Sequence, residues 1–143
     1  MKSLSIFLLT TCTMLTGCVS YREGQNVDLY TEIGGKETLS KVYGLALTRI
    51  YNDPVIGHYF EGVPKNDLRR ELTEQTCELI GGPCDYEGKS MLEAHKDLSI
   101  KDSEFFLLVE YVQQAMRDIG LTYQQENRIL SHLAPVKNEV VYH

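Results

Sequence analysis

The polar and apolar positions from residue 28 onward follow the period of a helix, and no run alternates as a half-buried strand would. Residues 39–50 carry an apolar stripe of the kind that faces a core: Leu39, Val42, Tyr43, Ala46, Leu47 and Ile50. The strongest periodic signal lies further on: Phe105, Leu108, Val109, Val112, Ala115, Met116 and Ile119. These stripes predict an all-α protein.

Turn-forming residues divide the first half of this pattern. The first helix should end at Asn52-Asp53-Pro54, because proline disfavours helical geometry in the residue before it. A short helical turn over residues 56–60 follows. Asn66 is a candidate cap for a helix over residues 67–80, which Gly81-Gly82-Pro83 should stop.

The second half is divided in the same way. Asp102 is the candidate cap of the helix that carries the strongest stripe, and Gly120 should close it. Thr122 and Gln125 have the spacing of a capping box for a last helix, which Pro135 should kink. That helix has its own stripe: Ile129, Leu130, Leu133, Val136 and Val140. Four substantial helices in 143 residues suffice for one packed domain but not for two.

The start of the chain has a different character. It has the three parts of a secretory signal: a charged start at Lys2, a short hydrophobic middle over residues 4–15 and a small residue at the exit, Gly17. Leu15-Thr16-Gly17-Cys18 resembles the bacterial lipobox, in which cleavage precedes a cysteine that is then lipidated. An ordinary signal peptide cut nearby is the alternative interpretation.

The chain is therefore expected to have three parts. Residues 1–17 are predicted to be a lipoprotein signal peptide, and residues 18–27 a flexible tether that begins at lipidated Cys18. Residues 28–143 form the folded domain. The residue after Cys18 is not aspartate, and by resemblance to sorted lipoproteins this favours the periplasmic side of the outer membrane in a bacterial cell envelope.

The charge of the chain limits its partners. The formal net charge is −6, and it becomes more negative if Lys2 leaves with the leader. Such a surface should attract neither nucleic acid nor anionic lipid headgroups. Contact with the membrane should therefore come from the lipid anchor alone.

Residues 29–141 resemble group one truncated haemoglobins. The segments that carry the resemblance are residues 29–35 (LYTEIGG), Tyr59-Phe60-Glu61-Gly62, Gly81-Gly82-Pro83, Tyr86-Glu87-Gly88, Met91, Ala94-His95, Leu98, Ile100 and Leu133-Ala134-Pro135. The resemblance implies a truncated globin fold, a two-over-two helical sandwich that binds one haem b per chain. It also implies that His95 is the proximal iron ligand and that Phe60 packs on the haem face.

These roles agree with the chemistry of the residues. A ligating imidazole must be neutral, and apolar neighbours disfavour its charged form. The other ring nitrogen would need an acceptor, for which the backbone carbonyl one turn earlier is suitable. We expect the cofactor to contact mainly apolar side chains: Phe60, Leu68, Leu72, Leu98, Ile100, Phe105 and Val109. Without the flanking pattern, a lone histidine is more often a surface residue than a ligand. His58, His132 and His143 match no ligand of the family.

The distal side departs from the commonest family pattern. Many relatives carry a tyrosine where Leu47 stands and a glutamine where Leu72 stands, and Leu68 is apolar as well. The polar candidates for the distal pocket are Tyr43, Gln75 and Thr76. Each lost hydrogen bond to bound dioxygen costs about 1 kcal/mol, whereas carbon monoxide loses less. We therefore expect weak binding or fast release of oxygen, unless Tyr43 or Gln75 turns toward the gas.

Cys77 and Cys84 are seven positions apart across the Gly-Gly-Pro turn. In an exported protein this spacing favours a disulfide between a helix end and the next loop, and two reduced, packed cysteines are the alternative.

Three functions remain open from the sequence. The favoured one is reversible binding of a diatomic gas (oxygen, carbon monoxide or nitric oxide), in the oxygen binding and transport class. A haem enzyme that detoxifies nitric oxide or peroxide is the second, and it would need an electron donor whose identity is unknown. A helical lipoprotein without a cofactor is the third.

Overall fold

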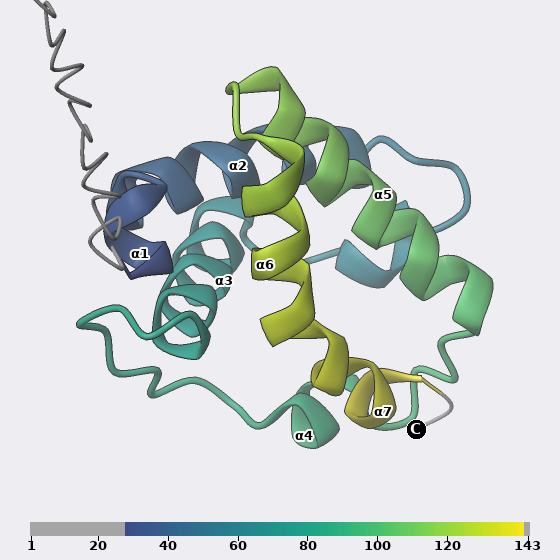
Figure 1. Ribbon diagram of the computed structural model, residues 1–143. Coiled ribbons are helices and arrows are strands. Elements are labelled where there is room, and N and C mark those ends of the chain that lie inside the picture. The colour runs from purple at the N-terminus through teal and green to yellow at the C-terminus, as the bar shows by residue number, and fades with distance from the viewer. Residues whose placement is uncertain (1–27, 142–143) are drawn as a thin grey trace, which may run out of the picture.

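The computed structural model describes residues 28–141, and every regular element in that range is helical (Figure 1). The elements are α1 (Leu29–Glu32), α2 (Gly35–Ile50), the 3-10 helix η1 (Gly57–Phe60), α3 (Lys65–Leu79), α4 (Met91–His95), α5 (Asp102–Asp118), α6 (Tyr123–Leu133), the 3-10 helix η2 (Ala134–Val136) and α7 (Lys137–Val140). The predicted all-α class is thus confirmed. The predicted leader, Cys18, the tether and His143 lie outside the described residues.

Helix α2 is the centre of the domain. It packs against both α3 and α5, and α6 also contacts these two helices (Figure 1). All six residues of the predicted α2 stripe are at most 5% exposed. They belong to the main core, which also includes nine other buried residues of the described range: Leu29, Ile33, Ile56, Cys77, Ile80, Val112, Ala115, Met116 and Ile129. The apolar periodicity therefore identified the core side of α2 correctly.

The start of α3 differs from the prediction. Asn66 is not the cap, because α3 begins at Lys65 with Pro64 in the capping position. The carbonyl of Pro64 accepts hydrogen bonds from the amides of Asp67 (3.0 Å) and Leu68 (3.1 Å). Proline holds the backbone torsion that a helix start needs, so the helix begins two residues earlier than the side-chain type of Asn66 suggested.

The end of α3 follows the prediction closely. The last helical residue is Leu79, and Gly81 has a φ of 84°. The amide of Gly82 then donates to the carbonyl of Cys77 over 2.7 Å. This left-handed termination satisfies a carbonyl of the last turn and turns the chain away from the helix axis.

The cap of α5 is also displaced from the prediction. Asp102 is the first helical residue, and Lys101 occupies the capping position. The Glu104 carboxylate accepts the backbone amide of Lys101 over 2.8 Å, which gives that amide the partner it would otherwise lack. The prediction of Asp102 as the cap was therefore wrong by one position, because a later acidic side chain reaches back to the helix start.

The C-terminal region is as expected. Thr122 and Gln125 form the predicted capping box: the Gln125 amide donates to Thr122 Oγ1 (3.3 Å) and the Thr122 amide to Gln125 Oε1 (2.9 Å). The chain around Pro135 leaves the α-helix at Leu133, forms η2 and continues as α7. Within residues 28–141, no helix has the length and apolar character needed to cross a membrane.

Candidate functional site

Helix α4 is short and its ends are well defined. Its cap is Ser90, whose Oγ accepts the amide of Glu93 (3.3 Å) while the Glu93 carboxylate accepts the amide of Ser90 (3.3 Å). The helix ends at His95, and Asp97 and Ser99 then take φ values of 65° and 52°. Two left-handed residues that are not glycine are uncommon in such a short stretch. The chain thus presents one histidine at the last position of a five-residue helix.

The ring of His95 is oriented by its own helix. Its Nδ1 lies 2.8 Å from the carbonyl oxygen of Met91, one turn earlier. A carbonyl can only accept, so the neutral ring carries its proton on Nδ1 and leaves the lone pair of Nε2 free. The sequence predicted such a carbonyl partner, and the structure contains it. His95 is half-buried, and its Nε2 has no hydrogen-bond partner within the described residues.

The described residues offer a metal ion little else. They contain no group of three or more His, Cys, Asp and Glu side chains that could hold a metal. A metal at His95 would therefore have to bring its remaining ligands with it, as iron in a porphyrin does. The donor set of this segment thus fits a haem better than a free metal ion.

The apolar residues predicted to contact the cofactor are covered less completely than the core. Phe60, Leu68, Leu72, Phe105 and Val109 are half-buried. Two others, Leu98 and Ile100, are 36% and 8% exposed. They come from η1, α3, α5 and the stretch after α4, and so from elements on several sides of the domain. Partly covered apolar side chains on several elements are what a large apolar ligand would need.

Phe60 is held by neighbours in and around η1. Its ring lies 5.4 Å from that of Tyr51, measured between centroids. The hydroxyl of the adjacent Tyr59 donates to the Glu104 carboxylate (3.0 Å), which joins η1 to the first turn of α5. The amide of Lys101 lowers the pKa of the Glu104 carboxyl, so this carboxylate stays charged and accepts both bonds near neutral pH.

On the distal side, the predicted residues divide into two groups. Leu47 is 1% exposed and belongs to the core, whereas Leu68 and Leu72 are half-buried against it. The Tyr43 hydroxyl forms a hydrogen bond with Thr76 Oγ1, and both residues are buried. Burial raises the pKa of Tyr43 to about 12, so the hydroxyl stays neutral. The structure therefore brings Tyr43 and Thr76 together but engages them with each other.

Gln75 is the remaining polar candidate on this side. Its side chain is half-buried and forms no hydrogen bond with any other residue of the described range. The distal side thus combines apolar leucines, one paired tyrosine and threonine, and one uncommitted amide.

The loop between α3 and α4 is tied at several points. The structure contains a disulfide between Cys77 and Cys84, whose Cα atoms are 5.8 Å apart. A Cβ on Gly82 would lie 2.6 Å from Cys77 Sγ, so only glycine fits beside the disulfide. The amide of Tyr86 donates to the Glu78 carboxylate (2.9 Å). These contacts fasten the polypeptide between α3 and the His95 segment.

The chain matches the bacterial-like globin family over residues 28–142, and it belongs to that family. Membership implies a haem cofactor, and the donor set at His95 fits that group. Relatives include the group 1 truncated haemoglobin of Tetrahymena pyriformis, with 26% identity over 66% of this chain and 78% of that protein. Another is the group 1 truncated haemoglobin GlbN of Mycolicibacterium paratuberculosis, with 27% identity over 84% of this chain and 88% of that protein.

Solved structures agree with the fold. The truncated haemoglobin of Tetrahymena pyriformis in its Fe(III) form superposes with a TM-score of 0.76 at 22% identity, over 80% of this chain and 98% of that one. The 2/2 haemoglobin of Synechococcus in the cyanomet state has a TM-score of 0.74 at 17% identity, with coverages of 80% and 98%. The predicted two-over-two helical sandwich is thereby confirmed.

Proposed function

We propose that this protein binds one haem b per chain through His95 and reversibly binds a diatomic gas. The observation that carries the proposal is the Nδ1 contact of His95 with the Met91 carbonyl, which leaves Nε2 as the free donor. Haem, if bound through His95 Nε2, would supply an iron that can bind a gas molecule. Membership of the globin family supports the same assignment.

The apolar side chains named above would exclude water from the cofactor. Phe60, Leu98 and Phe105 are not fully covered by protein, and their remaining exposed surface would gain by contact with a porphyrin ring. Noncovalent binding of haem b is consistent with this environment, because His95 would hold the iron and the apolar side chains would contact the ring.

The distal residues support a preference among gases. Leu68 and Leu72 cannot donate a hydrogen bond, and the hydroxyl of Tyr43 is engaged by Thr76. Dioxygen draws negative charge when it binds and depends on such donors, whereas carbon monoxide depends on them less. Among the described residues, Gln75 is the one uncommitted donor predicted for this side. We therefore propose that oxygen is released quickly relative to carbon monoxide, unless Gln75 turns toward the gas. A distal side poor in hydrogen-bond donors also favours gas binding over peroxide or nitric oxide turnover.

The decisive experiment compares the absorption spectra of the wild type, His95→Ala and His58→Ala. His58 is exposed and serves as the matched control. The wild type and His58→Ala should show a strong Soret band that shifts on addition of carbon monoxide to the reduced protein. The His95→Ala variant should fold, as judged by circular dichroism, but lose this spectrum and bind haem more weakly than the wild type. A folded wild type that takes up no haem, or an unaltered His95→Ala spectrum, would contradict the assignment.

A lipid anchor on Cys18 and a location on the periplasmic side of the outer membrane remain part of the proposal. Their support is the sequence Leu15-Thr16-Gly17-Cys18 that follows the apolar residues 4–15. Expression of the full chain with a radioactive fatty acid tests this directly. Label should enter the wild type and the Cys12→Ser control but not Cys18→Ser. Equal labelling of Cys18→Ser and the wild type would contradict an anchor at this position.

A further inference from the structure

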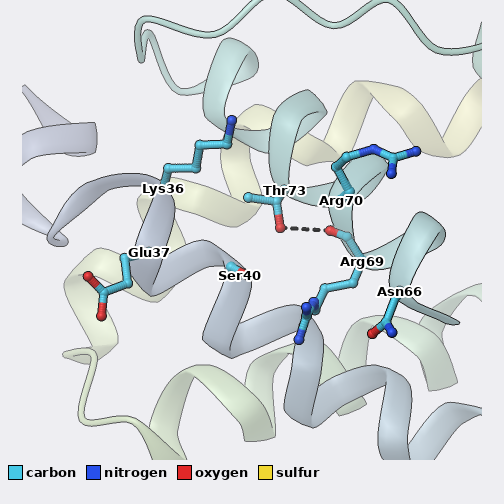
Figure 2. Close-up of a pocket in the computed structure, with 7 residues that line it drawn as sticks. All are labelled: Lys36, Glu37, Ser40, Asn66, Arg69, Arg70 and Thr73. Atoms are coloured by element: carbon cyan, nitrogen blue, oxygen red, sulfur yellow. Dashed lines mark hydrogen bonds between the residues drawn. The ribbon is translucent and has the colours of Figure 1, made fainter.

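A groove of about 490 Å³ lies between α2 and α3, and none of the residues that line it belongs to the predicted haem site (Figure 2). Lys36 and Ser40 line it from α2, and Asn66, Arg69 and Arg70 line it from α3. Its volume falls within the range of about 300–1,000 Å³ that is typical of sites for small molecules. The groove therefore calls for an explanation of its own.

The local charge of the groove is opposite to that of the chain. Its lining holds three cationic side chains and one carboxylate, in a chain of net charge −6. That carboxylate, Glu37, points away from the cationic side chains in Figure 2 and is bonded to Lys41 over 2.7 Å. The groove thus presents positive charge on a protein whose net charge is negative.

Arg69 is the central cation. Its guanidinium forms no ion pair and no hydrogen bond with any other residue in the described part of the chain. Its stem runs along α2 at Gly44, where an added Cβ would already lie 3.7 Å from Arg69 Cδ. A larger side chain at position 44 would displace the arginine. The sequence therefore leaves room for Arg69 to lie over α2 with its donors uncommitted.

Neutral donors stand beside this arginine. The Ser40 hydroxyl and the Asn66 amide form no hydrogen bond with another described residue. The Thr73 hydroxyl, by contrast, is committed to the Arg69 carbonyl over 2.7 Å, as the dashed line in Figure 2 shows. A guanidinium, a hydroxyl and an amide with free donors form a set that suits the oxygens of an anion.

The other two cations are paired, but weakly. Arg70 is bonded to Asp67 (3.0 Å) and Glu71 (3.2 Å), and its side chain is 60% exposed. Lys36 is bonded to Glu74, and its side chain is 49% exposed. Exposed pairs of this kind contribute about 0–1 kcal/mol, so either cation can exchange its partner for a bound anion at little cost.

We propose that this groove binds a small, multiply charged phosphorylated molecule, held by Arg69, with Lys36 and Arg70 as the other cations of the lining. The volume of about 490 Å³ is larger than a single phosphate group needs. Arginine presents paired N–H donors that match the oxygens of a phosphate. A soluble anion is favoured over the headgroups of a membrane, because the acidic remainder of the protein opposes a broad anionic surface.

Isothermal titration of the purified chain with tripolyphosphate tests this proposal without reference to the haem. The wild type should bind one equivalent, and affinity should fall as salt is raised. Arg69→Gln should weaken binding about tenfold or more, which corresponds to at least 1.4 kcal/mol. Arg128→Gln is the matched control, because Arg128 is bonded to Glu32 on another side of the domain, and it should bind as the wild type does.

A further measurement distinguishes a soluble phosphorylated molecule from the phosphate headgroups of a membrane. Vesicles of phosphatidylglycerol offered to the unlipidated Cys18→Ser chain should bind no more strongly than neutral vesicles. Strong binding to these vesicles without binding of tripolyphosphate would overturn the assignment to a soluble molecule. The groove would be refuted as a site if tripolyphosphate failed to bind at low salt. It would also be refuted if Arg69→Gln and the control Arg128→Gln lost affinity equally. A normal carbon monoxide spectrum in Arg69→Gln would show that the haem site is intact.

Discussion

Helix α2 and helix α4 differ in how completely the rest of the chain covers them. All residues of the α2 stripe are at most 5% exposed, and α3 and α5 cover the helix. In α4, by contrast, no residue is buried, and the element that packs most against it is α7, which has four residues (Figure 1). Within residues 28–141, α2 is covered by other helices of the chain, whereas α4 stays partly uncovered.

The difference follows from the residues available to each region. An amphipathic helix of sixteen residues can bury a continuous stripe and recover the entropy that folding costs. A helix of five residues cannot do so, and α4 depends on its capping box and on the loop that precedes it. If haem completes the region around α4, substitutions in α2 should lower the stability of the haem-free protein. Substitutions around α4 should instead weaken the retention of haem.

The largest expected effect is on the stability of the core. Leu39→Ala removes a side chain that is 1% exposed and should cost about 3 kcal/mol in the free energy of unfolding, measured with urea on haem-free protein. Leu98→Ala is the matched change beside α4, where the leucine is 36% exposed, and it should cost less than about 1 kcal/mol. Leu98→Ala should instead speed haem loss. Equal costs in the haem-free protein would contradict the proposed contrast.

The disulfide connects the two regions and should have the next largest effect. It closes a short loop, and the chain-entropy model gives about 2 kcal/mol for its contribution to stability. Cys77→Ser/Cys84→Ser should lower the urea midpoint accordingly and should also speed haem loss, because the loop leads to His95. The control is the same variant with and without reductant, which should show no difference. A wild type whose stability and haem retention are insensitive to reductant would rule out this role.

Limited digestion with trypsin tests the same difference between the α4 region and α2. Lys89, Lys96 and Lys101 flank or belong to the α4 region, and all three are exposed. Haem-free protein should be cut first at these residues, before Lys41 or Arg49 in α2, because cleavage needs only local opening there. Added haem should slow these first cuts about tenfold, which corresponds to about 1.4 kcal/mol. Haem should not protect His95→Ala in this way. Equal protection of that variant would contradict the role of His95 as the iron ligand.

Local patterns in the sequence predicted what depends on local physics. The α2 stripe, the Thr122–Gln125 capping box and the break at Pro135 each follow from residues within a few positions of one another. The caps of α3 and α5 were misplaced because more than one nearby residue could satisfy the first amides. Pro64 and Glu104 did so in place of the candidates.

Features that depend on two helices were harder to foresee. Tyr43 and Thr76 were each predicted for the distal pocket, yet only the packing of α2 on α3 shows that they bond to each other. The cationic groove was missed altogether, because Lys36 and Arg69 are far apart in the sequence and each is ordinary for an exposed helix face. Their juxtaposition needs the fold.

The smallest expected effect concerns the buried tyrosine. Because its hydroxyl is engaged by Thr76, Tyr43→Phe should change the release rates of oxygen and carbon monoxide less than about twofold, in stopped-flow measurements on haem-loaded protein. The same variant should lose about 1 kcal/mol of stability, because Thr76 keeps only its own helix as a partner. Leu72→Gln is the positive control, since a new donor there should slow oxygen release about tenfold and carbon monoxide release much less. Faster oxygen release from Tyr43→Phe would mean that the hydroxyl leaves Thr76 for the gas. In that case α2 would contribute a residue to the gas site as well as to the core.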